Sequence, residues 1–322
     1  MFIIAYYTCL NLIIIIIHSF ILLIYIFFLY IIEFEKYFIK EKNMKIAVLS
    51  GKGGTGKTLI STNLAAYIAK RYKVTLLDCD TEEPNCSIFI KPQIDTKTEV
   101  SLKISYIDSS SCNRCKKCSE NCYYGAISIF KQSHMIFDFL CHGCGLCTYI
   151  CPCNAIKETE KAIGSINSYI EKDNIVLHEG ILNIGQASGV RIIRKMKEKA
   201  ADSEVTILDS PPGSSCSVVE TLKGIDMALV VTEPTPYGLH DVDAVIQLCK
   251  NMGIPFSVII NKDCGSYEKM DLYFAEKGIE IVSRIPFSEE ISEQSSNGSL
   301  LIDGKSFLHI FERICKSIGV SV

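Results

Sequence analysis

A glycine-rich segment constrains the fold of this chain more than any other feature. Residues 49–58 read LSGKGGTGKT and fit the phosphate-binding pattern G-x-x-x-x-G-K-S/T. An apolar run at 46–49 precedes the segment and predicts a buried strand, and residues 59–69 follow it with helical apolar spacing. A chance glycine turn would lack this strand, loop and helix context. We therefore expect an α/β fold that binds a nucleotide.

The residues of this segment have distinct expected roles. Glycines allow successive backbone N–H groups to point at phosphate oxygens, and the positive end of the following helix adds to this attraction. Lys57 should reach the β- and γ-phosphates, and the Thr58 hydroxyl should ligate Mg²⁺. The predicted nucleotide-binding residues of the segment are Gly51, Lys52, Gly53, Gly54, Thr55, Gly56, Lys57 and Thr58.

Two further apolar runs end in acidic residues. The run VTLL leads into Asp78 and Asp80, and the run VTIL leads into Asp209. The carboxyl ends of parallel strands are where ligands bind in an open α/β sheet. Asp209 is therefore expected to hold Mg²⁺, and the N–H of Gly213 is expected to contact the γ-phosphate. A solvated acidic pair after the first run, or a plain turn after the second, is the alternative.

The last predicted strands bear on which nucleotide is bound. Runs at 227–231 and 256–260 read as strands, and the second leads into NKDC, which starts at Asn261. A guanine-reading N-K-x-D loop would need an acid where Cys264 stands. Asn261 is then expected to meet adenine, so ATP is preferred over GTP.

Cysteines dominate the middle of the sequence. The chain has sixteen, and eight of them lie between Cys112 and Cys151. Residues 112–129 and 141–158 form an internal repeat offset by 29 residues, with C-x₂-C-x₂-C-x₃-C in each. This is the ferredoxin spacing for two 4Fe–4S clusters, in which the fourth cysteine of each run ligates the other cluster. The expected ligands of cluster one are Cys112, Cys115, Cys118 and Cys151, and those of cluster two are Cys141, Cys144, Cys147 and Cys122.

The same cysteines could hold another soft-ligand metal. Zinc is the competitor, but its usual pattern is two C-x-x-C pairs rather than triplets with a trailing cysteine. The first run has Tyr123 where the second has Pro152, which affects loop shape and leaves the ligands intact. Cys153 is interpreted as a non-ligand. Clustering of this kind beside a phosphate-binding loop favours metal ligation in a reducing compartment over a secreted disulfide framework.

The N-terminal residues are extremely apolar. Residues 2–32 are almost continuously Ile, Phe, Leu and Tyr, which exceeds the roughly 20 apolar residues that span a bilayer. Lysines at 36, 40, 42 and 45 would keep the following part on the cytoplasmic side. The alternative is a mis-assigned start, because residues 1–43 contain no Gly, Val, Pro or Arg and Met44 directly precedes the first predicted strand. The formal net charge of −3 gives no reason to propose nucleic acid as a partner.

Residues 44–322 resemble the MinD/ParA superfamily of P-loop ATPases, in the form that carries an inserted ferredoxin domain. The resemblance rests on KGGTGKT, on the D-x-D that ends at Asp80, on DSPPG from Asp209 and on the eight cysteines. It implies that Lys52, the early lysine of the family's deviant loop, reaches across a homodimer to the partner's nucleotide. It also implies that Asp80 lies near Mg²⁺ and the attacking water. The expected catalytic residues are Lys52, Lys57, Asp80 and Asp209.

The resemblance also implies a fold class and a division into domains. We expect a P-loop NTPase fold with a mostly parallel sheet flanked by helices, interrupted by a small α+β bacterial-type ferredoxin domain. Residues 44–103 and 160–322 would form the ATPase, and residues 104–159 the inserted domain. Residues 1–43 would be the apolar extension. A cytoplasmic location is expected, or attachment to the cytoplasmic face of a membrane through residues 2–32.

The expected function is that of an ATP-hydrolysing iron–sulfur protein in which ATP gates electron transfer to a redox partner. ATP, Mg²⁺ and two 4Fe–4S clusters are the implied cofactors, and the implied assembly is a homodimer or a heterodimer with a paralogue. A carrier that releases clusters to client proteins and a MinD-like spatial organiser are the alternatives.

Cys216 is expected to be an ordinary small buried residue, with a redox or cluster-bridging role as the alternative. The last helix, at 307–318, is expected to pack in the core rather than bind a membrane.

Overall fold

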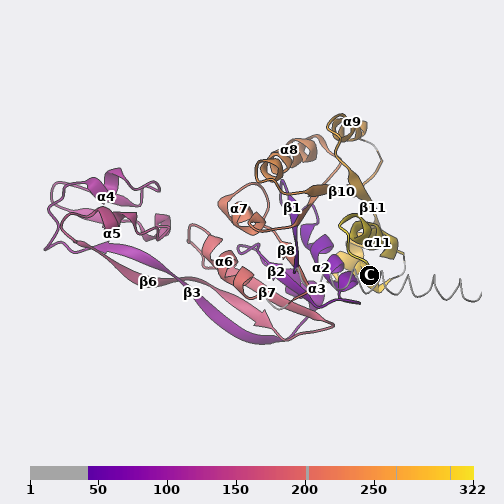
Figure 1. Ribbon diagram of the computed structural model, residues 1–322, viewed down its shortest axis with the longest axis horizontal. Helices are drawn as coiled ribbons and strands as arrows, with labels where there is room; N and C mark the ends of the chain where they lie inside the picture. The colour runs from indigo at the N-terminus through magenta and orange to yellow at the C-terminus, as the bar shows by residue number, and fades with distance from the viewer. Residues whose placement is uncertain (1–42, 201–202, 266, 305) are drawn as a thin grey trace, which may run out of the picture. The chain divides into compact units, whose positions relative to one another are not determined.

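A nine-stranded sheet organises the computed structural model, which describes residues 43–200, 203–265, 267–304 and 306–322 (Figure 1). The strand order is β11-β10-β9-β1-β8-β2-β7-β6-β3. Neighbours from β11 to β7 pair in parallel, whereas β7, β6 and β3 pair antiparallel. The strands are Met44–Ser50 (β1), Val74–Asp78 (β2), Ile94–Ile107 (β3), Ile156–Tyr169 (β6), Ile175–Leu182 (β7), Val205–Asp209 (β8), Met227–Thr232 (β9), Phe256–Asp263 (β10) and Ile281–Pro286 (β11).

Helices connect and cover the parallel strands. The four residues from Ile46 to Leu49 in β1 are completely buried, so both faces of the central strand are covered, as parallel sheets require. Local signals set some helix starts: α8 begins where Thr235 accepts a hydrogen bond from the Gly238 N–H and Pro236 occupies the first turn. The helices are Lys57–Ile68 (α2), Cys86–Ile90 (α3), Val190–Glu198 (α6), Cys216–Leu222 (α7), Pro236–Asn251 (α8), Glu268–Glu276 (α9), Glu289–Ser296 (α10) and Leu308–Ser317 (α11), with a 3-10 turn at Leu301–Asp303 (η2).

The predicted α/β architecture with a mostly parallel sheet is confirmed. Each apolar run that the sequence suggested as a strand lies in one of β1, β2, β8, β9 and β10. The expectation for the last helix is also confirmed, because α11 buries Ile310, Phe311, Ile314 and Cys315. The expected burial of Cys216 is wrong: this residue opens α7 directly after the DSPPG loop, and its position in the first turn exposes it to solvent.

The eight clustered cysteines lie in a small module between β3 and β6, which we define as residues 108–155. Figure 1 shows β3 and β6 leaving the sheet as a two-stranded ribbon, with α4 and α5 at its end. The module contains Lys117–Glu120 (α4), Ile127–Ile129 (β4), His134–Ile136 (β5), a 3-10 turn at Asp138–Leu140 (η1) and Leu146–Ile150 (α5). The strands β4 and β5 form a hairpin, and Ile107, Cys118, Ile127 and Ile156 form a small core of their own.

Two predictions about organisation stay untested. The predicted domain boundaries near residues 104 and 159 fall inside β3 and β6, which run on without a break; the division itself stays a prediction. Residues 2–32, suggested as a membrane anchor, lie outside the described residues. Within the part of the chain that the structure describes, no helix has the length and apolar character needed to cross a membrane.

Candidate functional site

The phosphate-binding loop lies between β1 and α2, at the carboxyl edge of the central strand. Gly56 precedes α2 with φ of 94°, a left-handed conformation that suits glycine. Asn261 is buried and donates a hydrogen bond from Nδ2 to the Thr55 carbonyl at 2.7 Å. A Cβ added at Gly56 would lie 2.2 Å from that Nδ2, so any side chain here would displace Asn261. Asn261 therefore braces the loop from the end of β10.

A hollow lies beside this loop. Asn261 and Gly56 form one side of it, and the segment that follows β11 forms the other. The prediction that Asn261 meets adenine stays a prediction. Its lining residues are Gly54, Gly56, Leu59, Asn261, Lys262, Pro286, Phe287, Ser288, Ile291, Ser292, Ser295 and Ser296.

Asp209 ends β8 next to the start of α2. Its carboxylate accepts hydrogen bonds from the Thr58 hydroxyl at 2.6 Å and from the Ser61 hydroxyl at 2.9 Å. Complete burial raises the pKa of Asp209, and the Thr58 hydrogen bond and the Lys57 charge oppose the rise. A hydroxyl and a carboxylate brought together beside a phosphate loop are the oxygen ligands that Mg²⁺ prefers. The donor set thus fits the metal that the sequence predicts at Thr58 and Asp209.

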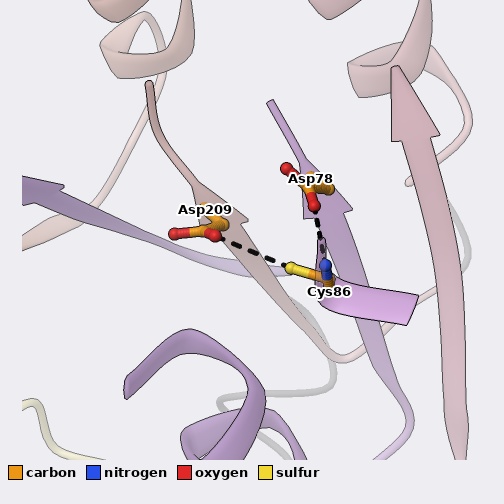
Figure 2. Close-up of side chains that lie close together, drawn as sticks. All are labelled: Asp78, Cys86 and Asp209. Atoms are coloured by element: carbon orange, nitrogen blue, oxygen red, sulfur yellow. Dashed lines mark hydrogen bonds between the residues drawn. The ribbon is translucent and has the colours of Figure 1, made fainter. Parts of the chain in front are cut away.

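A cysteine that the sequence did not single out completes this edge of the site. Figure 2 shows Asp78, Cys86 and Asp209 close together, and their ligand-type atoms all lie within 4.8 Å of one another. The Cys86 thiol donates to Asp209 Oδ2 at 3.6 Å. Burial raises the pKa of Cys86, so the thiol is protonated and acts as a hydrogen-bond donor.

Asp78 holds the loop that follows β2. Its Oδ2 accepts the N–H groups of Asn85 at 2.8 Å and Cys86 at 2.9 Å, and its Oδ1 accepts the Asp80 N–H at 3.2 Å. Burial and the neighbouring Asp209 charge raise its pKa well above the usual value. Both carboxylate oxygens are thus engaged by the backbone of residues 80–86. Asp78 therefore fixes the position of Asp80.

Asp80 is half-buried at the tip of β2. Burial raises its pKa to about 6; Lys57 opposes the rise, and Asp209 adds to it. A carboxyl whose pKa is raised on folding contributes stability below its ordinary pKa of 3.8 and loses it as the pH rises to about 6. The carboxylate form, which accepts a hydrogen bond from an attacking water more strongly than the protonated form, therefore predominates only above about pH 6.

This shift leads to a prediction about pH. We expect the ATP hydrolysis rate to fall about tenfold for each pH unit below 6, because protonation removes the accepting carboxylate. Steady-state rates between pH 4.5 and 8 would measure this. The Asp80→Asn variant should be slower at every pH and lack the acidic limb. An acidic limb that persists unchanged in this variant would assign the titration to another group.

Lys52 forms an ion pair with Glu233 of its own chain. Its Nζ lies 2.9 Å from Glu233 Oε2, and the Lys262 Nζ lies 2.7 Å from the other Glu233 oxygen. Lys262 also donates to the Gly54 carbonyl at 2.8 Å. Burial raises the pKa of Glu233, but hydrogen bonds from Lys262 and Lys52 outweigh it and lower the pKa, so the acid is ionised. Glu233 directly follows β9 and is a second site residue for which the sequence predicted no role.

Each predicted cysteine quartet lines one cavity of the module. The first cavity contains Cys112, Cys115, Cys118 and Cys151, and the second contains Cys122, Cys141, Cys144 and Cys147. Cys118 also borders the second cavity, so the two cavities are neighbours. Among the described residues, no three of these eight sulfurs lie within 4.8 Å of one another.

Backbone N–H groups point at the sulfurs that close each quartet. The Ala126 N–H donates to Cys122 Sγ and the Ala155 N–H donates to Cys151 Sγ, both at 3.3 Å. Burial raises the pKa of Cys151, but the surrounding N–H groups outweigh it and lower the pKa. A lowered pKa favours the thiolate, which is the form that ligates metals. The alanine that follows each run at the same spacing is thus the source of a matched hydrogen bond.

Comparison with known proteins decides the family. The sequence profile of the CobQ/CobB/MinD/ParA nucleotide binding domain matches residues 46–302. This chain belongs to that family. An uncharacterised protein of Methanocaldococcus jannaschii is 33% identical over 265 residues, covering 82% of this chain and 91% of the relative. An iron-sulfur cluster carrier protein of Pyrococcus abyssi is 24% identical over 313 residues, covering 87% and 90%.

Solved structures support the same fold. The septum site-determining protein MinD of Pyrococcus horikoshii, complexed with Mg-ADP, superposes with a TM-score of 0.53 at 16% identity, covering 87% of this chain and all of that chain. The MinD of Pyrococcus furiosus gives a TM-score of 0.52 at 18% identity, covering 85% and 99%. The P-loop NTPase domain predicted from the loop and the strand-end acids is confirmed by the sequence profile, and these structures share its fold.

Proposed function

We propose that this family member hydrolyses ATP and that its nucleotide state controls electron transfer through two 4Fe–4S clusters bound by the cysteine module. The observation that carries the proposal is the pair of neighbouring cavities, each lined by one complete quartet. In both quartets three cysteines come from one run and the fourth from the other, which is the ligation that the ferredoxin spacing predicts. Complete ligation within one chain favours clusters that stay bound while electrons pass.

The nucleotide half of the proposal rests on residues gathered at one edge of the sheet. Lys57 and the N–H groups of the loop bind the phosphates of ATP, and Thr58 with Asp209 holds Mg²⁺, which supplies positive charge beside the phosphates. Asp80 accepts a hydrogen bond from the attacking water. Lys52 is proposed to leave Glu233 and reach the nucleotide of a second protomer, so that ATP closes a homodimer.

A continuous set of contacts joins the nucleotide edge to the module. Thr81 follows Asp80 and accepts the Leu182 N–H at 2.8 Å. A Cβ at Gly189 would lie 2.1 Å from the Thr81 hydroxyl, so the loop after β7 packs directly against Thr81. That loop and α6 share a cavity with the second cysteine quartet; its lining includes Gln186, Ser188, Arg191, Arg194, Cys141, His142 and Cys144. Beside this cavity, Arg191 of α6 donates a hydrogen bond from Nε to the Ser101 carbonyl of β3 at 2.8 Å, and a Cβ at Gly143 would lie 2.7 Å from Leu102 of β3. Movement of the loop after β2 on hydrolysis would thus reach the second quartet through α6 and β3.

A cluster carrier is the second candidate function. The observation in its favour is the likeness to proteins named iron-sulfur cluster carrier in three Pyrococcus species, at 24–25% identity. A carrier must release its cluster to a client, whereas an electron-transfer protein must retain it. Iron retention therefore separates the two functions.

The test uses protein purified without oxygen. We expect about eight iron atoms per chain, a value set by two 4Fe–4S clusters, and reversible reduction by dithionite. The iron should stay on the chain when MgATP and an apo-ferredoxin are added and the two proteins are separated. ATP-dependent movement of iron to the apo-ferredoxin would support the carrier instead. A colourless protein containing zinc would contradict both functions.

A further inference from the structure

The loops that begin at Cys112 and Cys141 share a backbone conformation but differ in the side chains that they expose. At the offset of 29 residues, Arg114 corresponds to Gly143 and Lys116 to Gly145. All four have left-handed backbones, with φ of 55° and 64° in the first loop and 62° and 73° in the second. This conformation costs a glycine little and a side-chain-bearing residue more. The first loop therefore carries basic side chains at two positions where glycine would be less strained.

Packing explains one glycine of the second loop, Gly143, and not the basic residues of the first. A Cβ at Gly143 would lie 2.7 Å from the Lys103 carbonyl and from the Leu102 side chain, so β3 excludes any side chain there. In the first loop Arg114, Lys116 and the adjacent Lys117 are all exposed. Strain at an exposed position that packing does not require is a feature of binding surfaces.

The charges of the two loops differ in the same way. Between Cys112 and Cys122 there are three basic residues and one acid, Glu120. Asp108 also lies nearby, where its carboxylate accepts hydrogen bonds from the Ser110 and Ser111 hydroxyls.

The second loop offers no such charge. Between Cys141 and Cys151 no residue is acidic, and His142 is the one basic side-chain type. His142 stacks on Tyr124 with ring centroids 3.7 Å apart.

The basic side chains surround the first cavity. Arg114, Lys116 and Lys117 line it together with the exposed Cys115, whereas the second quartet borders the cavity beside α6. We infer that the loop from Cys112 to Cys118 is the docking surface for an acidic one-electron carrier protein, so that electrons enter or leave at the first quartet. This inference rests on the proposed function. One electron passes between the reduced iron–sulfur centre of one protein and the oxidised centre of the other, with no bond made and no proton moved.

Binding of a plant-type 2Fe–2S ferredoxin, a small acidic protein, provides the test. The loop variant Arg114→Gly, Lys116→Gly and Lys117→Leu gives the first loop the residues of the second and relieves backbone strain, so it should fold. Calorimetric titration at 20 mM salt should show at least about tenfold weaker binding for this variant and a shallower dependence on salt, because attraction between exposed charges is screened. Cytochrome c, a basic protein, should bind neither form at low salt.

The control removes the same charge elsewhere. Changing Lys250, Lys269 and Lys316 to Ala deletes three exposed lysines from α8, α9 and α11, and ferredoxin binding should change less than about twofold. Equal ferredoxin binding by the wild type and the loop variant would overturn the inference. It would also be overturned if the wild type bound anionic vesicles but not ferredoxin. Iron content, measured on the same samples, tests the proposed function separately: wild type without iron contradicts that function, whereas intact iron with unchanged ferredoxin binding contradicts only the docking surface.

Discussion

Removing Cys115 together with Cys151 should leave about half of the iron in the protein, whereas removing Cys115 together with Cys122 should leave almost none. The first pair lines one cavity although its members come from different runs, and the second pair comes from one run although its members line different cavities. A cluster that lacks one of its four thiolates is lost, so the iron content per chain depends on how many clusters lack a ligand. Iron and sulfide assays on alanine variants purified without oxygen would measure this.

The opposite pattern would show that each run binds its own cluster. A matched control is Cys153→Ala, because Cys153 borders the first cavity without belonging to either quartet. This variant should keep the full iron content. Loss of half of the iron in the Cys153 variant would mean that Cys153 replaces one of the proposed ligands.

Changing Lys52 to Ala should lower the ATP hydrolysis rate by a factor on the order of 10³, the lower end of the effect of a cation supplied in trans to a phosphoryl-transfer site. The reason is that Lys52 is proposed to serve the partner's nucleotide, although this single chain pairs it with Glu233. Nucleotide binding by the monomer should change little, since Lys57 remains. Steady-state hydrolysis and fluorescent-nucleotide titration would separate the two effects.

Mixing variants tests whether Lys52 acts across a dimer. The Asp80→Asn variant keeps Lys52 but lacks the proposed water-orienting carboxylate. In a mixed dimer, the Lys52→Ala protomer keeps its own Asp80 and receives Lys52 from its partner, so one of the two sites is complete. Random assembly should therefore restore about a quarter of the wild-type rate, because half of the dimers are mixed and each has one active site. A mixture as inactive as its two components would place the action of Lys52 within its own chain.

The parts of the structure that local pattern determines could be predicted from the sequence. The phosphate-binding loop, the apolar parallel strands and the cysteine repeat each depend on residues close together in the chain. The β3–β6 ribbon could not be predicted, because its stretches at 95–99 and 157–160 are polar and exposed. Their pairing depends on partners far away in the sequence, such as Thr98 opposite Ile166, 68 positions apart.

The candidate site was predictable only in part, for a similar reason. Asp80 and Asp209 stand at the carboxyl ends of buried strands, which is where ligands bind in an open α/β sheet, so the sequence predicted both. Glu233 also directly follows a strand, β9, so the same rule would have found it. Cys86 gave no such signal, because its contact with Asp209 joins residues 123 positions apart. The positive φ of Arg114 and Lys116 was equally invisible, since basic residues rarely adopt it.

The midpoint potentials of the bound clusters, measured with and without MgATP, test the coupling between nucleotide and module most directly. Contacts run from Thr81 through the loop after β7 and α6 to β3, which packs against Gly143 of the second quartet's loop, so closing the nucleotide site should alter hydrogen bonding or exposure there. We expect ATP to shift at least one potential by about 60 mV or more, which is a tenfold change for one electron. The Asp80→Asn variant should hold the shifted value. Potentials that are the same in both states would contradict control of the clusters by the nucleotide.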